Sequence, residues 1–187
     1  MALFFGNIAP YKGVEFLLDA FEAIAPADES LRLIIAGRPK GEEAYWAGLL
    51  EKIKRSAARA RIILKIEYVP DAETEIYFKA ADVLVLPYTH IFQSGVLFLG
   101  YNFGMPIVAT DVGQLRDDIS EGETGFICAP KDASALAAAL KKFFASDLFL
   151  QLKTRRQDIR RFANDRYSWS KVADITTDVY NHLLKVK

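Results

Sequence analysis

Short apolar runs of strand length recur along the chain and alternate with amphipathic stretches. Near-continuous apolar runs are typical of parallel strands that are buried on both faces. In the stretches between them, apolar residues return at the period of a helix. The predicted strands cover residues 2–6, 31–36, 62–66, 83–87, 107–110 and 125–128. The predicted helices cover residues 13–25, 41–58, 71–80, 94–103, 132–145, 147–163 and 168–185.

This alternation predicts an α/β fold, namely a doubly wound, Rossmann-like parallel sheet of about six strands with helices on both faces. After Pro130 the predicted elements are all helical. No internal repeat, low-complexity segment or Pro/Gly-rich linker divides the sequence, so we expect a single domain over residues 1–187. If the strand order is 3-2-1-4-5-6, the loops after the first and fourth strands face each other across one crevice.

The segment from Val83 to Thr110 contains no Asp, Glu, Lys or Arg. Its length would suit a transmembrane helix, but Pro87, Asn102 and Pro106 interrupt it. These interruptions favour a buried strand, a polar loop, a buried helix and a second buried strand. We therefore predict no transmembrane segment.

Composition narrows the range of partners. Lys plus Arg and Asp plus Glu both number 24, so no net charge draws the chain to nucleic acid or to an anionic membrane. The single cysteine, Cys128, excludes an intrachain disulfide and a cysteine-built zinc site, and we expect it to be inert core. The two histidines, His90 and His182, lie far apart in sequence, and we expect no metal site.

The beginning of the sequence and two charged segments also lead to expectations. No signal peptide precedes the first strand, which predicts a cytoplasmic protein, peripheral to the membrane in its full-length form. The strand begins directly after Met1, which indicates a fragment whose partner half lies upstream. We expect Asp117-Asp118 to be a solvated turn or helix cap, and the basic segment Lys153–Arg161 to be a solvated helix face.

Two loops carry the residues that favour phosphate binding. The loop after the first strand offers a glycine turn at Gly6 and a cation, Lys12, which we expect to be exposed in the crevice. The loop after the fourth strand leads into a helix at Ser94-Gly95, where free backbone N–H groups attract anions. Together these loops predict a cradle for a diphosphate. Read alone, Lys12 is equally a surface lysine, and neither a Walker motif nor a G-x-G-x-x-G fingerprint is present.

A set of motifs stands in one order along residues 2–145: Gly6 with Lys12-Gly13, Ile34-Ile35-Ala36-Gly37, Ala80-Ala81-Asp82-Val83 running into Leu86-Pro87, Gly104-Met105-Pro106-Ile107-Val108-Ala109-Thr110 with Gly113, and Gly122-Glu123-Thr124-Gly125-Phe126 with Asp132. The ordered set resembles the carboxy-terminal, donor-binding domain of a GT-B fold glycosyltransferase of the group 1 family (family 4). Tyr167-Ser168-Trp169 also resembles the start of the last helix of that family, which often returns to the other domain.

The resemblance implies a hexosyltransferase-like enzyme. It would transfer a sugar from a UDP- or GDP-linked donor to an acceptor hydroxyl, with retention of configuration and without a cofactor or metal ion. The amino-terminal acceptor domain is missing from this chain, so we expect the isolated chain to bind nucleotide without transferring sugar. Two alternatives stay open: a non-catalytic nucleotide-binding or assembly module, and a nucleotide-sugar epimerase-like domain.

The resemblance also implies roles for individual residues, although it assigns no catalytic residue. The diphosphate would contact Gly6, Lys12, Gly13, Gln93, Ser94, Gly95 and Val96. The nucleobase would lie near Gly37, Arg38, Tyr68 and Val69, and His90 is a candidate contact for the donor sugar.

The sequence departs from the family pattern in three places. Asn7 stands where the family usually has an arginine after the first glycine, so one phosphate-binding cation is missing. Ile91 and Leu99 stand where the family usually has two glutamates, and neither can accept a hydrogen bond from a sugar or ribose hydroxyl. Gln93 and His90 are the local polar candidates to replace them. The Gln93-Ser94-Gly95 form resembles a subset of the family with this replacement.

Overall fold

The computed structural model describes residues 1–41 and 43–185. Its six strands form one sheet with the order β3-β2-β1-β4-β5-β6, and every neighbouring pair is parallel. This is the order under which the loops after the first and fourth strands were expected to face each other. The strands are β1 (Ala2–Phe5), β2 (Leu33–Ala36), β3 (Ile62–Lys65), β4 (Val83–Leu86), β5 (Ile107–Thr110) and β6 (Gly125–Cys128).

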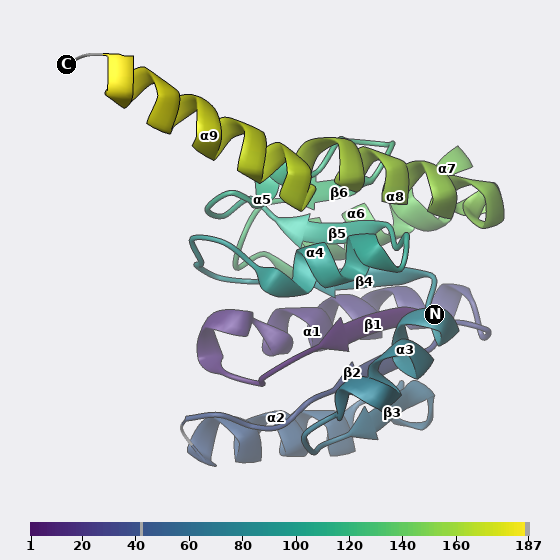
Figure 1. The fold of residues 1–187 in the computed structure, drawn as a ribbon. Helices are drawn as coiled ribbons and strands as arrows, with labels where there is room; N and C mark the ends of the chain where they lie inside the picture. The colour runs from purple at the N-terminus through teal and green to yellow at the C-terminus, as the bar shows by residue number, and fades with distance from the viewer. Residues whose placement is uncertain (42, 186–187) are drawn as a thin grey trace.

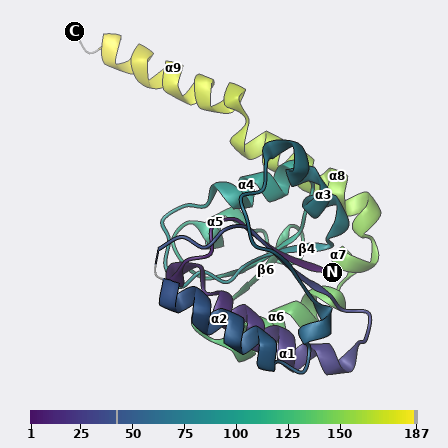
Figure 2. The same cartoon turned by 90° about the horizontal axis from the view of Figure 1, so that it is seen from below.

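Helices cover both faces of this sheet (Figures 1 and 2). One face carries α1 (Val14–Ile24), α2 (Glu43–Arg55) and α6 (Ala133–Phe144). The opposite face carries α3 (Asp71–Ala80), α4 (Gly95–Asn102) and α8 (Leu152–Tyr167). The chain thus has the doubly wound, Rossmann-like fold that the alternating pattern predicts.

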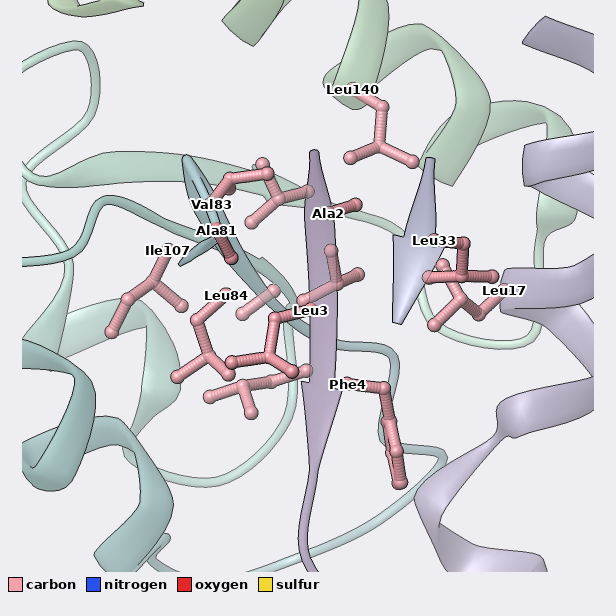
Figure 3. Close-up of a cluster of buried hydrophobic side chains, with 14 of the residues drawn as sticks. Ala2, Leu3, Phe4, Leu17, Leu33, Ala81, Val83, Leu84, Ile107 and Leu140 are labelled. Carbon is pink, nitrogen blue, oxygen red and sulfur yellow. The ribbon is translucent and has the colours of Figure 1, made fainter. Parts of the chain in front are cut away.

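The core lies on both sides of the central strands. Along β1, Ala2 and Phe4 point toward the layer that contains Leu17 and Leu140, whereas Leu3 points to the other side (Figure 3). All residues of β4 and β5 are buried, as expected for strands in the middle of a parallel sheet. Complete burial of a Val, Leu or Ile side chain in these strands stabilises the folded state by about 1.5–3 kcal/mol relative to leaving it exposed.

The helical C-terminal part differs from the prediction at one point. The single helix predicted over 147–163 is two helices, α7 (Asp147–Leu150) and α8, with a break at Gln151. Leu148 is buried, and the Phe149 ring packs 5.4 Å from that of Phe143. The change of direction lets α7 contribute to the core before α8 crosses the other face.

Short elements were not predicted, and two helices differ in how they begin. The helix α5 (Leu115–Asp118) and three 3₁₀ turns, η1 (Pro10–Lys12), η2 (Ala25–Ala27) and η3 (Arg59–Arg61), were not predicted. Asp132 caps α6, because its Oδ1 accepts a hydrogen bond from the backbone N–H of Ala135 at 2.9 Å. Helix α3 instead has Pro70 as its N-cap residue, and Asp71 is its first helical residue.

The expectation of a solvated Asp117-Asp118 turn is wrong for Asp118, which is buried. The hydroxyl of Tyr167 donates to its Oδ1 at 2.7 Å, and the hydroxyl of Tyr101 donates to its backbone carbonyl at 2.6 Å. Tyr167 at the end of α8 therefore bonds to the carboxylate of Asp118, and Tyr101 of α4 bonds to its backbone. Because a buried carboxylate needs hydrogen-bond donors, the bond from Tyr167 ties the last residue of α8 to α5.

The basic segment on α8 is only partly solvated. Lys153, Arg160 and Arg161 are exposed, but Arg156 is half-buried and donates to the backbone carbonyl of Ala81 at 2.6 Å. Burial lowers the pKa of its guanidinium. Arg156 thus attaches α8 to the end of α3. Cys128 is buried, as predicted, and burial raises the pKa of its thiol to about 12.

The last helix, α9 (Trp169–Lys185), projects away from the sheet and its covering helices (Figures 1 and 2). Its large apolar side chains are exposed: Trp169, Val172, Ile175, Val179, Tyr180, Leu183 and Leu184. We call these residues the α9 apolar surface. Within the described residues, no helix combines the length and the hydrophobicity needed to cross a bilayer.

Candidate functional site

A cavity of about 230 Å³ opens at the carboxyl ends of β1, β2 and β3. In a doubly wound sheet, ligands bind at this edge, where the strand order reverses. The cavity brings together several residues that the sequence assigned to the site: Gly6, Lys12, Gly37, Arg38, Tyr68, Val69 and Val96. Four further residues line it without having been assigned a role there: Phe5, Asn7, Tyr11 and Glu67.

The wall after β1 is built by close approach of two backbones. The N–H of Gly6 donates to the carbonyl of Ala36 at 2.9 Å, and the N–H of Gly37 donates to that of Lys65 at 2.9 Å. Gly37 has a φ of +144°, and a Cβ at this position would overlap the carbonyl oxygen of Gly6. Only glycine fits there, because a side chain would push the two loops apart.

Lys12 lies deeper than the sequence predicts. Only 6% of its surface is exposed, and its Nζ lies 3.8 Å from the centre of the Tyr88 ring and 5.1 Å from that of Tyr11. No carboxylate of the described residues forms an ion pair with it. Burial lowers the pKa of this ammonium group to about 8. The expectation of a side chain exposed in the crevice is therefore wrong, because the rings of Tyr11 and Tyr88 lie against its ammonium group.

The loops after β1 and β4 lie against each other, as expected. A Cβ at Gly13 would overlap the carbonyl oxygen of Pro87, and the N–H of Thr89 donates to the carbonyl of Tyr11 at 2.8 Å. Gly13 is buried in this contact and does not line the cavity. Its role is to join the two loops.

The start of α4 forms the second wall. Ser94 is the N-cap residue, but its hydroxyl makes no capping hydrogen bond and lies 3.3 Å from the hydroxyl of Tyr88. Gly95 is exposed, and a Cβ there would meet no atom within 4 Å. Val96 lines the cavity, next to Gly6. The first N–H groups of α4 thus begin beside the cavity at an open position, which is the geometry that attracts an anion.

The remaining assigned residues lie beyond the cavity lining. His90 and Gln93 are exposed, and the Nδ1 of His90 lies 3.1 Å from the Oγ1 of Thr89. Ile91 is half-buried. Leu99 lines a neighbouring cavity of about 660 Å³. Neither of the two positions that usually carry glutamates therefore lines the cavity at the ends of β1, β2 and β3.

Tyr68 and Val69 line both cavities. The guanidinium of Arg38 lies 5.8 Å from the centre of the Tyr68 ring, and the ring itself is 62% exposed. An exposed aromatic face beside a cation suits the stacking of a planar ring. The contact between Lys12 and Tyr88 could not be predicted from the sequence, since it depends on two loops that meet only in the folded chain.

Comparison with known proteins identifies a family that matches most of this chain. The profile of the family described as "Glycosyl transferases group 1" matches residues 1–146. The chain belongs to this family. Among the curated members of related sequence is the D-inositol 3-phosphate glycosyltransferase of Corynebacterium urealyticum, which is 26% identical over 185 residues. The match covers 96% of this chain and 42% of that protein, so this group 1 chain spans well under half of the relative's length.

Solved structures show that this group 1 chain has the fold of the carboxy-terminal domain of a GT-B glycosyltransferase. The C-terminal domain of the group 1 protein LpcC from Francisella tularensis superposes with a TM-score of 0.77 at 17% identity, covering 90% of this chain and 86% of that domain. The Anabaena protein HepE in complex with UDP superposes with a TM-score of 0.80 at 21% identity, covering 98% of this chain and 48% of that one.

Proposed function

We propose that this chain is the donor-binding part of an enzyme that transfers a sugar from a nucleotide-diphosphate sugar to an acceptor hydroxyl. One observation carries the proposal: a buried cation, Lys12, and the open start of α4 at Gly95 lie at the switch point of the sheet. Both features favour a group with several negative charges, such as a diphosphate.

Catalysis in this proposal is mainly electrostatic. Negative charge grows on the diphosphate as the bond to the sugar breaks, and Lys12 together with the N–H groups of α4 stabilises that charge. The nucleobase stacks on Tyr68 near Arg38. The sugar extends toward the open edge, where His90 and Gln93 offer polar groups. Following the family resemblance, we propose retention of the anomeric configuration and no metal ion.

The acceptor side of the enzyme belongs to an amino-terminal domain outside this chain. The length of the relatives beyond the matched part supports this, since the chain covers 42% of the D-inositol 3-phosphate glycosyltransferase. The α9 apolar surface is the place where that domain would pack, because large apolar side chains on a projecting helix favour burial. Detectable sugar transfer by the isolated chain would contradict this arrangement.

The first experiment is calorimetric titration of the chain with UDP and GDP. The complex of HepE with UDP makes UDP the first nucleotide to test. Absence of binding to both would contradict the proposed function. Sugar transfer by the two-domain protein, with the anomeric configuration of the product read by NMR, then separates an enzyme from a non-catalytic nucleotide-binding module.

A further inference from the structure

Tyr88 lies between the two groups that we assign to the diphosphate. Its ring faces the Nζ of Lys12 at 3.8 Å, and its hydroxyl lies 3.3 Å from the Oγ of Ser94 at the start of α4. The side chain is fully buried. Its backbone carbonyl accepts a hydrogen bond from the Oγ1 of Thr110 at 2.6 Å, which ties the residue to the end of β5. The ring is therefore held in place from both the backbone and the hydroxyl.

The contact between the Tyr88 ring and Lys12 affects the free-energy cost of burying the ammonium group. A buried ammonium group is costly unless something compensates its charge. A carboxylate partner would compensate it, but that carboxylate would then compete with an incoming phosphate. The face of an aromatic ring attracts a cation through its quadrupole and carries no net charge. Lys12 above Tyr88 thus keeps its full positive charge available for an anion.

The contact with Ser94 has a second consequence. Burial raises the pKa of the Tyr88 hydroxyl, so the group stays neutral and acts through its hydrogen bond. A buried hydroxyl without a partner is unfavourable, which makes the contact with Ser94 a constraint on the start of α4. One side chain therefore touches a residue of the loop after β1 and a residue of the loop after β4.

We propose that Tyr88 is a positioning residue for the diphosphate of the donor: its ring sets the ammonium of Lys12, and the contact of its hydroxyl with Ser94 helps to hold the ring in place. This inference rests on the proposed function. The proposed role of Tyr88 differs from a purely structural role in one measurable respect. If Tyr88 acts through Lys12, removing the ring weakens nucleotide binding only while the ammonium group is present.

The test is a double-mutant cycle with UDP titrated by calorimetry. Lys12→Met removes the charge and keeps most of the stem, and Tyr88→Leu removes the ring. We expect Lys12→Met to weaken UDP binding by about 10- to 100-fold and Tyr88→Leu by about 10-fold. In the Lys12→Met background, Tyr88→Leu should weaken binding by less than about 3-fold. Tyr88→Phe keeps the ring and should stay within about 3-fold of the wild type.

The controls separate the possible failures. Tyr101→Leu is a matched control. Like Tyr88, Tyr101 is fully buried and makes a hydrogen bond, but it lines neither of the two cavities beside Tyr68. The variant should lower the melting temperature and leave UDP affinity unchanged. Tyr88→Met is a second ring-free variant in case Tyr88→Leu does not fold, because methionine fills irregular space.

Three results would overturn the inference. Unchanged UDP affinity in the ring-free variants would remove Tyr88 from the site, while the proposed function would stand. Equal weakening in the wild-type and Lys12→Met backgrounds would reduce Tyr88 to a core residue. Absence of UDP and GDP binding to the wild type would overturn the proposed function and this inference together.

Discussion

The cavity wall formed by the loops after β1 and β2 and the wall formed by the start of α4 both contain small residues, but the reasons differ. At Gly37, a side chain would collide with the backbone of Gly6, so the fold itself requires glycine. At Gly95, the space beside the backbone is open, and the fold makes no such demand. A glycine that packing does not explain is therefore the better indicator of a binding role. Substitution of Gly37 should therefore change stability, and substitution of Gly95 should change binding.

The largest effect is expected at Gly37. Gly37→Ala places a Cβ against the carbonyl of Gly6 in a backbone conformation that disfavours side chains, so the free energy of unfolding should fall by about 3 kcal/mol or more. Urea denaturation measures this. Gly41→Ala is the matched control, because Gly41 also has a positive φ but its added Cβ meets nothing within 4 Å. It should cost about 1 kcal/mol. Equal losses at the two positions would show that backbone strain alone matters.

Gly95→Leu tests the other wall. A leucine at the first position of α4 covers the N–H groups that we assign to the diphosphate, so UDP affinity should fall on the order of 100-fold. The free energy of unfolding should change by less than about 1 kcal/mol, because the side chain has room and leucine favours helix over glycine. A lower melting temperature in this variant would contradict the openness of the site. Unchanged UDP affinity would place the diphosphate elsewhere.

Lys12→Met should change both the affinity for UDP and the free energy of unfolding. UDP affinity should fall by about 10- to 100-fold, while the free energy of unfolding at pH 7 should rise by about 1–2 kcal/mol, because a buried charge is replaced by an apolar side chain. Burial lowers the pKa of Lys12 from 10.5 to about 8, so between these values the unfolded chain binds more protons than the folded one. Wild-type stability should therefore rise with pH across that window, and the variant should lack this rise.

The pH dependence of UDP binding follows from the same group. Wild-type affinity should decline as the pH rises above about 8, since the free ammonium loses its proton. Tyr11 and Tyr88 face Lys12, and Arg38 and Glu67 line the same cavity. The profile of Lys12→Met, measured in parallel, subtracts the contributions of these groups and of UDP itself. Identical profiles in the two proteins would exclude Lys12 as their cause.

The smallest effect is expected at Asn7, which is exposed and lines the cavity. Asn7→Arg restores the cation that the family usually has after the first glycine, and UDP should bind about 3- to 10-fold more tightly. Asn7→Gln is the control, because it lengthens the side chain without adding charge. If both variants bind alike, the position lies out of reach of the phosphates.

Much of the fold could be predicted because its signal is local. The residues of β4 and β5 are all buried, and strands buried on both faces consist of apolar runs that can be recognised in the sequence. The break at Gln151 could not be predicted, since the sequence on both sides of it is helical and the cause is the packing of Leu148 and Phe149 into the core. The strand order followed from the fold class once the alternation of strands and helices was recognised.

The site could be predicted in part for the same reason. Gly6 and Gly37 directly follow β1 and β2, and Lys12 lies in the loop after β1, so their place at one edge of the sheet follows from the topology. The burial of Lys12 depends on Tyr88, which lies in a loop distant in sequence. No local sequence pattern predicts that contact. Asp118 is a similar case, because Tyr167 reaches it from the end of α8.

The burial of Lys12 without a carboxylate partner among the described residues has a practical consequence for identifying the donor. In the proposed function, a bound diphosphate would supply the missing counter-charge, and the free energy of unfolding would rise most for the nucleotide that binds most tightly. At a ligand concentration of 100 Kd the gain is about 2.7 kcal/mol, a readily measured rise in melting temperature. A thermal-shift survey of commercial nucleotide sugars would then rank candidate donors by affinity, without an acceptor and without the remainder of the enzyme.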